Sequence, residues 1–137
     1  MHLNTLRRAQ LVTHMQCVLL LFVCCCRCLM IDRKWGQMIL NGEKSIEVRH
    51  FKNQQHCGKR VGLCFNGTSR VYGYVTFINN IKFCPRSWIA EQGQHRVPED
   101  TVPYGGKAWG WVCADPEWVG TPFLIHRKVG AQIFQKL

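Results

Sequence analysis

Acidic residues are scarce in this chain of 137 residues, which has 8 Asp and Glu against 18 Lys and Arg and a formal net charge of +10. None of the acidic residues lies within positions 1–31. Residues 32–82 hold nine basic and three acidic residues, a net charge of +6. This balance favours anionic partners, of which nucleic acid is the commonest, although a generally basic surface would give the same count.

The chain also lacks an apolar run long enough for a membrane-spanning helix. The run CVLLLFVCCC at positions 17–26 has ten residues, whereas a spanning helix needs about 20. Arg7 and Arg8 precede it, so the segment resembles the basic and apolar regions of a signal peptide.

Three interpretations of this leader, residues 1–27, remain open. It is a signal peptide or membrane anchor, an extra apolar strand of the domain, or upstream sequence absent from the working protein, since Met15 and Met30 could each start translation. We favour the last, because residues 28–137 have the pattern of a complete domain. A membrane partner is expected only if the leader is an anchor, and a secretory route only if it is a signal peptide.

Several catalytic and metal-binding motifs are missing as well. The sequence contains no HExxH, no glycine-rich phosphate loop and no supported Ser-His-Asp arrangement. No Cys/His spacing matches a zinc site, so we expect no metal and no cofactor. The nine cysteines favour buried thiols in a reducing compartment, cytoplasmic or nuclear. Four histidines in basic loops are expected at the surface: His50, His56, His95 and His126.

The pattern of apolar residues predicts a single mostly-β (α+β) domain. Apolar residues spaced i, i+3 and i+4 predict a short helix in RKWGQMILNG, which Asn41-Gly42 would end. Asn66-Gly67 between two apolar runs predicts a hairpin of strands 60–65 and 70–78. Further strands are expected near 28–32, 45–51, 107–115 and 122–137, with a turn at DPEW, 115–118, and one or two helical turns in RSWIAEQG. Five to seven short strands favour a small barrel.

Three charges lie within or beside one of these predicted strands. In SIEVRHF, alternation puts Ile46 and Val48 on one face and Glu47 and Arg49 on the other, with Lys44 just before them. On an open sheet this would be an exposed pair of little energetic value. In a barrel the same face would line a cleft, where converging charges are costly unless they are used.

The segment WGQMILNGEKSIEVR resembles the signature of the ASCH domain, a PUA-like β-barrel family whose first helix ends in Gly-x-Lys-x-x-Glu-x-Arg. Gly42, Lys44, Glu47 and Arg49 match that motif position by position. AWGWVCADPEW and the terminal RKVGAQIFQKL also resemble the closing strands of the family, so the likeness covers residues 28–137.

This resemblance implies a small PUA-like β-barrel with a cleft for RNA or a modified nucleoside. The expected ligand-binding residues are the four motif residues with Tyr104 and Trp109, whose rings could stack a base. Core packing is expected of at least one of the two tryptophans Trp109 and Trp111. We expect a monomer.

Two alternatives remain. Some small bacterial members of the family deacetylate acetylcytidine with a lysine, a threonine and a distant glutamate. Lys44 matches the lysine, Glu47 stands at the position of the threonine, and the distant glutamate has three candidates: Glu91, Glu99 and Glu117. If the protein is such an amidohydrolase, Lys44 and Glu47 are its catalytic residues. The other alternative is a protein-interaction domain with an unused cleft.

Overall fold

The computed structural model describes residues 27–125 and 134–136. Six strands form one sheet in the order β2-β5-β4-β3-β1-β6. The leader interpretations concern residues that lie almost wholly outside the described part. The elements are β1 (Arg27–Ile31), α2 (Arg33–Leu40), β2 (Ile46–Arg49), β3 (Arg60–Phe65), β4 (Arg70–Lys82), α3 (Pro85–Ala90), α4 (Gln92–His95), the 3₁₀ turn η1 (Tyr104–Gly106), β5 (Trp109–Leu124) and β6 (Phe134–Lys136).

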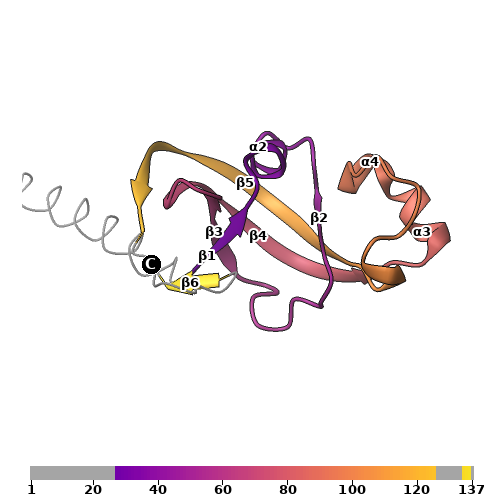
Figure 1. Cartoon of the computed structure of the whole chain (residues 1–137). Coiled ribbons are helices and arrows are strands. Elements are labelled where there is room, and N and C mark those ends of the chain that lie inside the picture. The colour runs from indigo at the N-terminus through magenta and orange to yellow at the C-terminus, as the bar shows by residue number, and fades with distance from the viewer. Residues whose placement is uncertain (1–26, 126–133, 137) are drawn as a thin grey trace, which may run out of the picture.

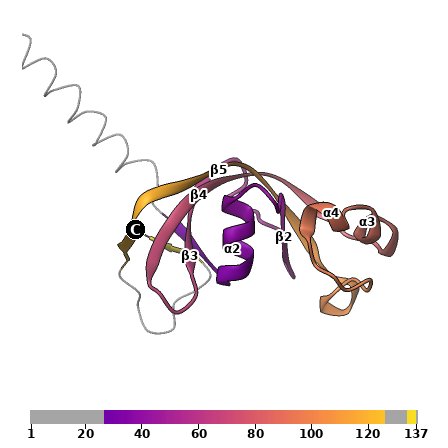
Figure 2. The same ribbon diagram turned by 90° about the horizontal axis from the view of Figure 1, so that it is seen from above.

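The sheet is curled, and α2 packs inside the curve (Figures 1 and 2). The long antiparallel pair β4 and β5 forms its back, and β1 runs parallel to β3 at one side. Ile39 and Leu40 of α2 join the apolar side chains of β1, β3, β4 and β5 in the main core. The fold is therefore mostly β with short helices and a half-barrel sheet, which confirms the predicted PUA-like α+β class.

Glycine lets α2 approach the sheet and then ends the helix. Gly36 is buried, and a β-carbon there would lie only 2.8 Å from Cδ1 of the Phe65 ring. Gly42 has φ +78°, a left-handed conformation that suits glycine, and its N–H donates to the carbonyl of Ile39. The predicted stop at Asn41-Gly42 is confirmed, and the turn delivers Lys44 to the start of β2.

The hairpin predicted at Asn66-Gly67 is also confirmed, because β3 and β4 pair antiparallel around it and Gly67 has φ +82°. β4 continues to Lys82, four residues beyond the predicted end. The extra length is paired with the first half of β5.

The turn predicted at 115–118 is wrong. β5 runs through this segment as one strand, and its pairing with β4 shifts between Ala114–Thr76 and Glu117–Tyr74. Asp115 has φ +51°, so the proline and the left-handed residue form a β-bulge instead of a chain reversal. Pairing with the long β4 strand outweighs the local turn preference of Asp-Pro.

A second, smaller core covers the other face of β2. Ile46 packs with Phe83, Trp88 and Ala108, and Val48 lies against the same cluster. Helices α3 and α4 follow β4 and lie beside this end of the sheet (Figure 1). Since Ile46 and Val48 are used in this way, Glu47 and Arg49 must point to the concave side that α2 partly fills.

The prediction that the scattered cysteines are buried holds only in part. Cys64 is buried, whereas Cys57 and Cys84 are exposed and Cys113 is partly buried. The apolar neighbours of Cys84 fill the small core while Cys84 itself begins α3 at the surface. Within the described ranges, no helix has the length and apolar character required to cross a membrane.

Candidate functional site

A cleft of about 180 Å³ opens where the end of β1, the start of α2 and β2 meet. An engineered cavity of roughly 150 Å³ holds a benzene ring, so the cleft is large enough for one aromatic ring. Its lining comes from β1, the start of α2, β2 and the turns at Asn66 and Tyr104: Met30, Ile31, Asp32, Trp35, Glu47, Val48, Arg49, Asn66 and Tyr104.

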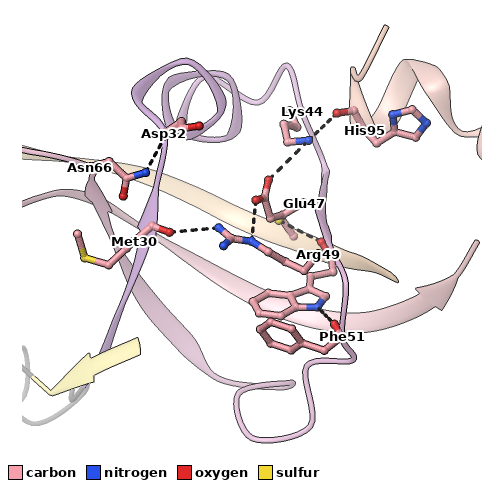
Figure 3. Close-up of polar contacts among 10 residues, drawn as sticks. Met30, Asp32, Lys44, Glu47, Arg49, Phe51, Asn66 and His95 are labelled. Carbon is pink, nitrogen blue, oxygen red and sulfur yellow. Dashed lines mark hydrogen bonds and ion pairs between the residues drawn. The ribbon is translucent and has the colours of Figure 1, made fainter. Parts of the chain in front are cut away.

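Glu47 and Arg49 form the charged wall of this cleft. Arg49 Nε donates to Glu47 Oε1 at 3.0 Å, and Arg49 Nη2 donates to the carbonyl oxygen of Met30 at 3.1 Å (Figure 3). Their side chains are only 7% and 17% exposed, and the guanidinium carbon lies 5.8 Å from the centre of the Trp111 ring. Among the described residues Arg49 Nη1 has no hydrogen-bond partner, so the guanidinium keeps donors for a ligand.

Lys44 lies behind Glu47 and does not line the cleft. Its Nζ is 3.6 Å from Glu47 Oε2 and donates to the carbonyl oxygen of His95 at 2.5 Å (Figure 3). The residue is 2% exposed, and Nζ also lies 4.8 Å from the centre of the Trp35 ring. Burial lowers the pKa of the Lys44 ammonium, and the Glu47 carboxylate opposes that shift.

The carboxylate of Glu47 therefore bridges two cations, Lys44 on one oxygen and Arg49 on the other. A buried charge is stable only when it is paired. Together, Lys44, Glu47 and Arg49 place one net positive charge in a small, partly closed space. The wall can accept an additional acceptor-rich or anionic group, while Glu47 can accept a hydrogen bond from a ligand amine.

Helix α4 holds the segment that carries Lys44. Besides the His95 carbonyl, the backbone carbonyl of Gln94 accepts from Ser45 N–H at 3.0 Å, and the Gln94 side chain accepts from the Ser45 hydroxyl. The carbonyl of Ser45 in turn accepts from Cys113 N–H at 2.8 Å. The position of Lys44 thus depends on residues about fifty positions later in the chain.

His95 is fully buried, which contradicts its predicted surface position. Its Nδ1 accepts from Val97 N–H at 3.0 Å, so Nε2 carries the proton and donates to the carbonyl of Trp88 at 2.9 Å. The ring stacks on Trp88 at 3.8 Å between centroids. Burial lowers the pKa of the His95 imidazole.

His56 is also buried, at 4% exposure, and burial lowers its pKa as well. His50 is exposed as predicted, and His126 lies outside the described residues. A histidine in a polar segment gives no local signal of burial, because the covering residues come from distant parts of the chain.

Two polar residues and a tyrosine form the rim of the cleft. Asn66 Nδ2 donates to Asp32 Oδ1 at 2.6 Å, which joins the β3–β4 turn to the start of α2 (Figure 3). Tyr104 is 52% exposed and has φ +57°, followed by two glycines that also have positive φ. Strained backbone of this kind concentrates at functional sites. No sequence motif marks Asp32, Asn66 or the Met30 carbonyl as part of a cleft, because their place in it depends on curling of the sheet.

A thiol lies near this charged group without serving as a nucleophile. Burial, with a further contribution from Glu47, raises the pKa of Cys113 to about 12. The thiol is therefore protonated at neutral pH, and the thiolate is the reactive form.

The structure brings together three of the six residues predicted to bind a ligand. Glu47, Arg49 and Tyr104 line the cleft, whereas Gly42 lies at an exposed turn and Lys44 is behind the wall. Trp109 is half-buried next to the cleft wall, as the cross-strand partner of Arg49. Trp111 is fully buried, which confirms the expected core role for one tryptophan. Whether these residues bind a ligand stays a prediction.

The three glutamates considered as a distant catalytic group do not line the cleft. Glu117 pairs with Arg60 at 2.6 Å. Glu91 is the C-terminal cap residue of α3, and the backbone carbonyl of Glu99 accepts a hydrogen bond from Trp88 Nε1. No group of three His, Cys, Asp or Glu side chains within 27–125 and 134–136 could hold a metal ion.

Comparison with solved structures decides the fold. The crystal structure of ASCH from Zymomonas mobilis matches with a TM-score of 0.65 at 14% identity, over 81% of this chain and 86% of that chain. The fold of this chain is ASCH-like. A tyrosine-to-phenylalanine variant of the same bacterial protein matches with a TM-score of 0.67 at 14% identity, over 81% and 88% of the two chains. Its serine-to-alanine variant gives 0.64 at 12% identity, over 81% and 87%.

The ASCH-like fold rests on structure alone. No protein-family model matches the sequence, and no curated protein matches it either. The resemblance noticed in the segment from Trp35 to Arg49 is confirmed at the level of the fold.

Proposed function

We propose that this ASCH-like domain binds RNA or a modified nucleoside, with one base in the cleft between β1, α2 and β2. The observation that carries the proposal is the buried pair of Glu47 and Arg49 in the wall of a ring-sized cleft. Burial of charged groups costs free energy, and apolar residues of the same size would fill these positions if their only role were to pack against neighbouring side chains.

The wall is complementary to the edge of a base. The Glu47 carboxylate accepts from an amino group such as that of cytosine, and the remaining Arg49 donors meet a ring nitrogen or carbonyl oxygen beside it. Tyr104 stands at the rim with half of its surface exposed, where its ring can stack on the base. The formal charge of +10 favours a ligand that carries phosphate.

The amidohydrolase alternative has less support from the geometry. Lys44 is held by Glu47 and the His95 carbonyl, away from the cleft. A lysine that acts on an acetyl group must be within hydrogen-bond reach of it. Of the two catalytic candidates, Lys44 and Glu47, only Glu47 lines the cleft and can contact a ligand there.

Calorimetric titration of the full chain with cytidine, acetylcytidine and a hexaribonucleotide tests the proposal. Arg49→Lys keeps the charge but loses the planar fork, so we expect binding to weaken by roughly tenfold or more. Arg70→Lys makes the same change at an exposed position and should leave affinity unchanged. Absence of binding to all three ligands, or equal binding by the Arg49→Lys variant, would reject the cleft and favour the protein-interaction alternative.

The same acetylcytidine samples distinguish binding from catalysis. Chromatography after long incubation would show cytidine only if the chain hydrolyses the acetyl amide. Release above that of Lys44→Ala would establish the amidohydrolase alternative. We expect no release.

A further inference from the structure

Trp109 lies directly beside the cleft wall on the same face of the sheet. It is the cross-strand partner of Arg49, just as Trp111 is the partner of Glu47. Side chains of directly opposite residues in an antiparallel pair are neighbours. Trp111 is fully buried, whereas Trp109 is only half-buried, so part of its indole remains accessible one step along from Arg49.

Two lysines converge on this ring. Lys52 Nζ lies 5.8 Å and Lys82 Nζ 5.9 Å from the centre of the Trp109 indole. They come from different segments, the loop after β2 and the end of β4. Both residues are exposed, and within the described ranges neither ammonium has a carboxylate partner. Two like charges at one ring, neither of them paired with a carboxylate of the described residues, leave a site for an anion.

We propose that Trp109, Lys52 and Lys82 form a second nucleotide subsite, so that the ligand is a single strand of at least two nucleotides and not a free nucleoside. The inference rests on the proposed function, because the first base occupies the cleft beside Arg49. The next base stacks on Trp109, and the two lysines hold the phosphates that flank it.

The chemistry of the three side chains agrees with this arrangement. Stacking on an indole tolerates every base, and lysine supplies a point charge to phosphate. The contact of an exposed lysine with an aromatic ring is weaker than base stacking. The lysines can therefore leave the ring for the phosphates when a base arrives.

A length series of oligocytidylate, with one, two, four and six nucleotides, tests the inference on the full chain. We expect affinity to rise sharply between one and two nucleotides. Trp109→Leu keeps apolar bulk but loses the π-face, so its affinity for the hexamer should fall by roughly tenfold. Its affinity for the mononucleotide should stay unchanged.

Salt dependence gives a second measurement that does not alter the core. Each phosphate contact to a single strand contributes about 0.7 to the slope of log affinity against log salt. Lys52→Ala/Lys82→Ala should therefore flatten the hexamer slope by about 1.4. Arg70→Ala is the control, because Arg70 is exposed at the opposite end of β4 from Lys82 and should not change the slope.

The outcomes separate the two proposals. If the mononucleotide binds through Arg49 but the hexamer binds no tighter, and the lysine variant keeps the full slope, the second subsite is rejected and the cleft remains. If the hexamer binds through Trp109 and the lysines while Arg49→Lys has no effect, the cleft is rejected instead. If Trp109→Leu does not fold, the lysine variant alone decides. The deoxy hexamer distinguishes RNA from single-stranded DNA, and tighter binding of either hexamer than of its mononucleotide supports the subsite.

Discussion

Arg49 on β2 donates to the carbonyl oxygen of Met30 on β1 at 3.1 Å, and this contact connects the two sides of the curled sheet. β2 is one edge of the sheet, whereas β1 lies near the other edge. β6 pairs with residues 27–29 of β1, and Met30, whose carbonyl oxygen the guanidinium contacts, is the next residue along β1. The same side chain thus shapes the cleft and faces its interior.

Removal of this contact should weaken the fold. In Arg49→Met the Met30 carbonyl and one oxygen of Glu47 lose their donor, and hydrogen bonds to charged groups contribute about 1.5–3 kcal/mol. We expect the free energy of unfolding to fall by that amount in urea titrations. Arg70→Met, at an exposed site, should change it by less than about 0.5 kcal/mol. Equal stability of the two variants would contradict the role of Arg49 in closing the sheet.

Glu47→Gln should be strongly destabilising, because it leaves the buried Lys44 ammonium without its carboxylate. Loss of one partner of a buried pair costs about 3–5 kcal/mol. Burial already lowers the pKa of Lys44, and loss of Glu47 lowers it further. As the pH rises toward 10, Lys44 can lose its proton in the folded variant, so the destabilisation should shrink. Urea titrations at pH 7 and pH 10 measure this, and a penalty that grows with pH would refute it.

Protonation of the buried histidines should destabilise the protein in acid. The pKa of His95 is lowered by burial and by Lys44, while the Trp88 carbonyl and Glu91 oppose the shift. The unfolded chain therefore binds a proton near the ordinary pKa of about 6.5, before the folded chain does. Stability is full above that pH and falls as the pH drops below it toward the folded-state value.

Thermal unfolding measured from pH 7.5 to 5 should show this loss. His95→Gln should reduce the slope with pH, and so should His56→Gln, since burial also lowers the pKa of His56. A slope that both single variants leave intact would assign the acid sensitivity to other groups.

Gly36→Ala should destabilise the packing of α2 on the sheet. The new β-carbon would overlap the Phe65 ring, which is fully buried and cannot move aside freely. Overpacking of this kind costs about 1–3 kcal/mol. Gly93→Ala is the matched control, because it lies in α4 with nothing within 4 Å of the added carbon. The control should be neutral or slightly stabilising, and an equal loss in both variants would contradict the close approach of α2.

Alkylation should distinguish the exposed thiol of Cys84 from the thiol of Cys113 near the site. Cys84 is exposed, and its hydrogen bonds with the Ser87 hydroxyl and the Ser87 backbone N–H lower its pKa. Cys113 has a pKa of about 12, so its thiolate is almost absent at neutral pH. Iodoacetamide followed by peptide mass mapping should label Cys84 well before Cys113. Fast labelling of Cys113 would mean that the charged group is open to solvent.

The sequence by itself determined the local elements and the identity of the charged strand. Asn66-Gly67 made a hairpin and Asn41-Gly42 ended a helix, because both depend on backbone preferences of a few neighbouring residues. Alternation placed Glu47 and Arg49 on one face, since side chains alternate across a strand.

Only the tertiary structure decided how those charges are used. In the folded chain Lys44 lies behind Glu47, and His95 is buried. Arg49 donates to the Met30 carbonyl, and the segment at Asp115 that was predicted to turn is part of a continuous strand. Each of these depends on contacts between residues far apart in the chain. Burial and pairing across a curled sheet are set by the summed packing of distant segments, and no local pattern of residues specifies them.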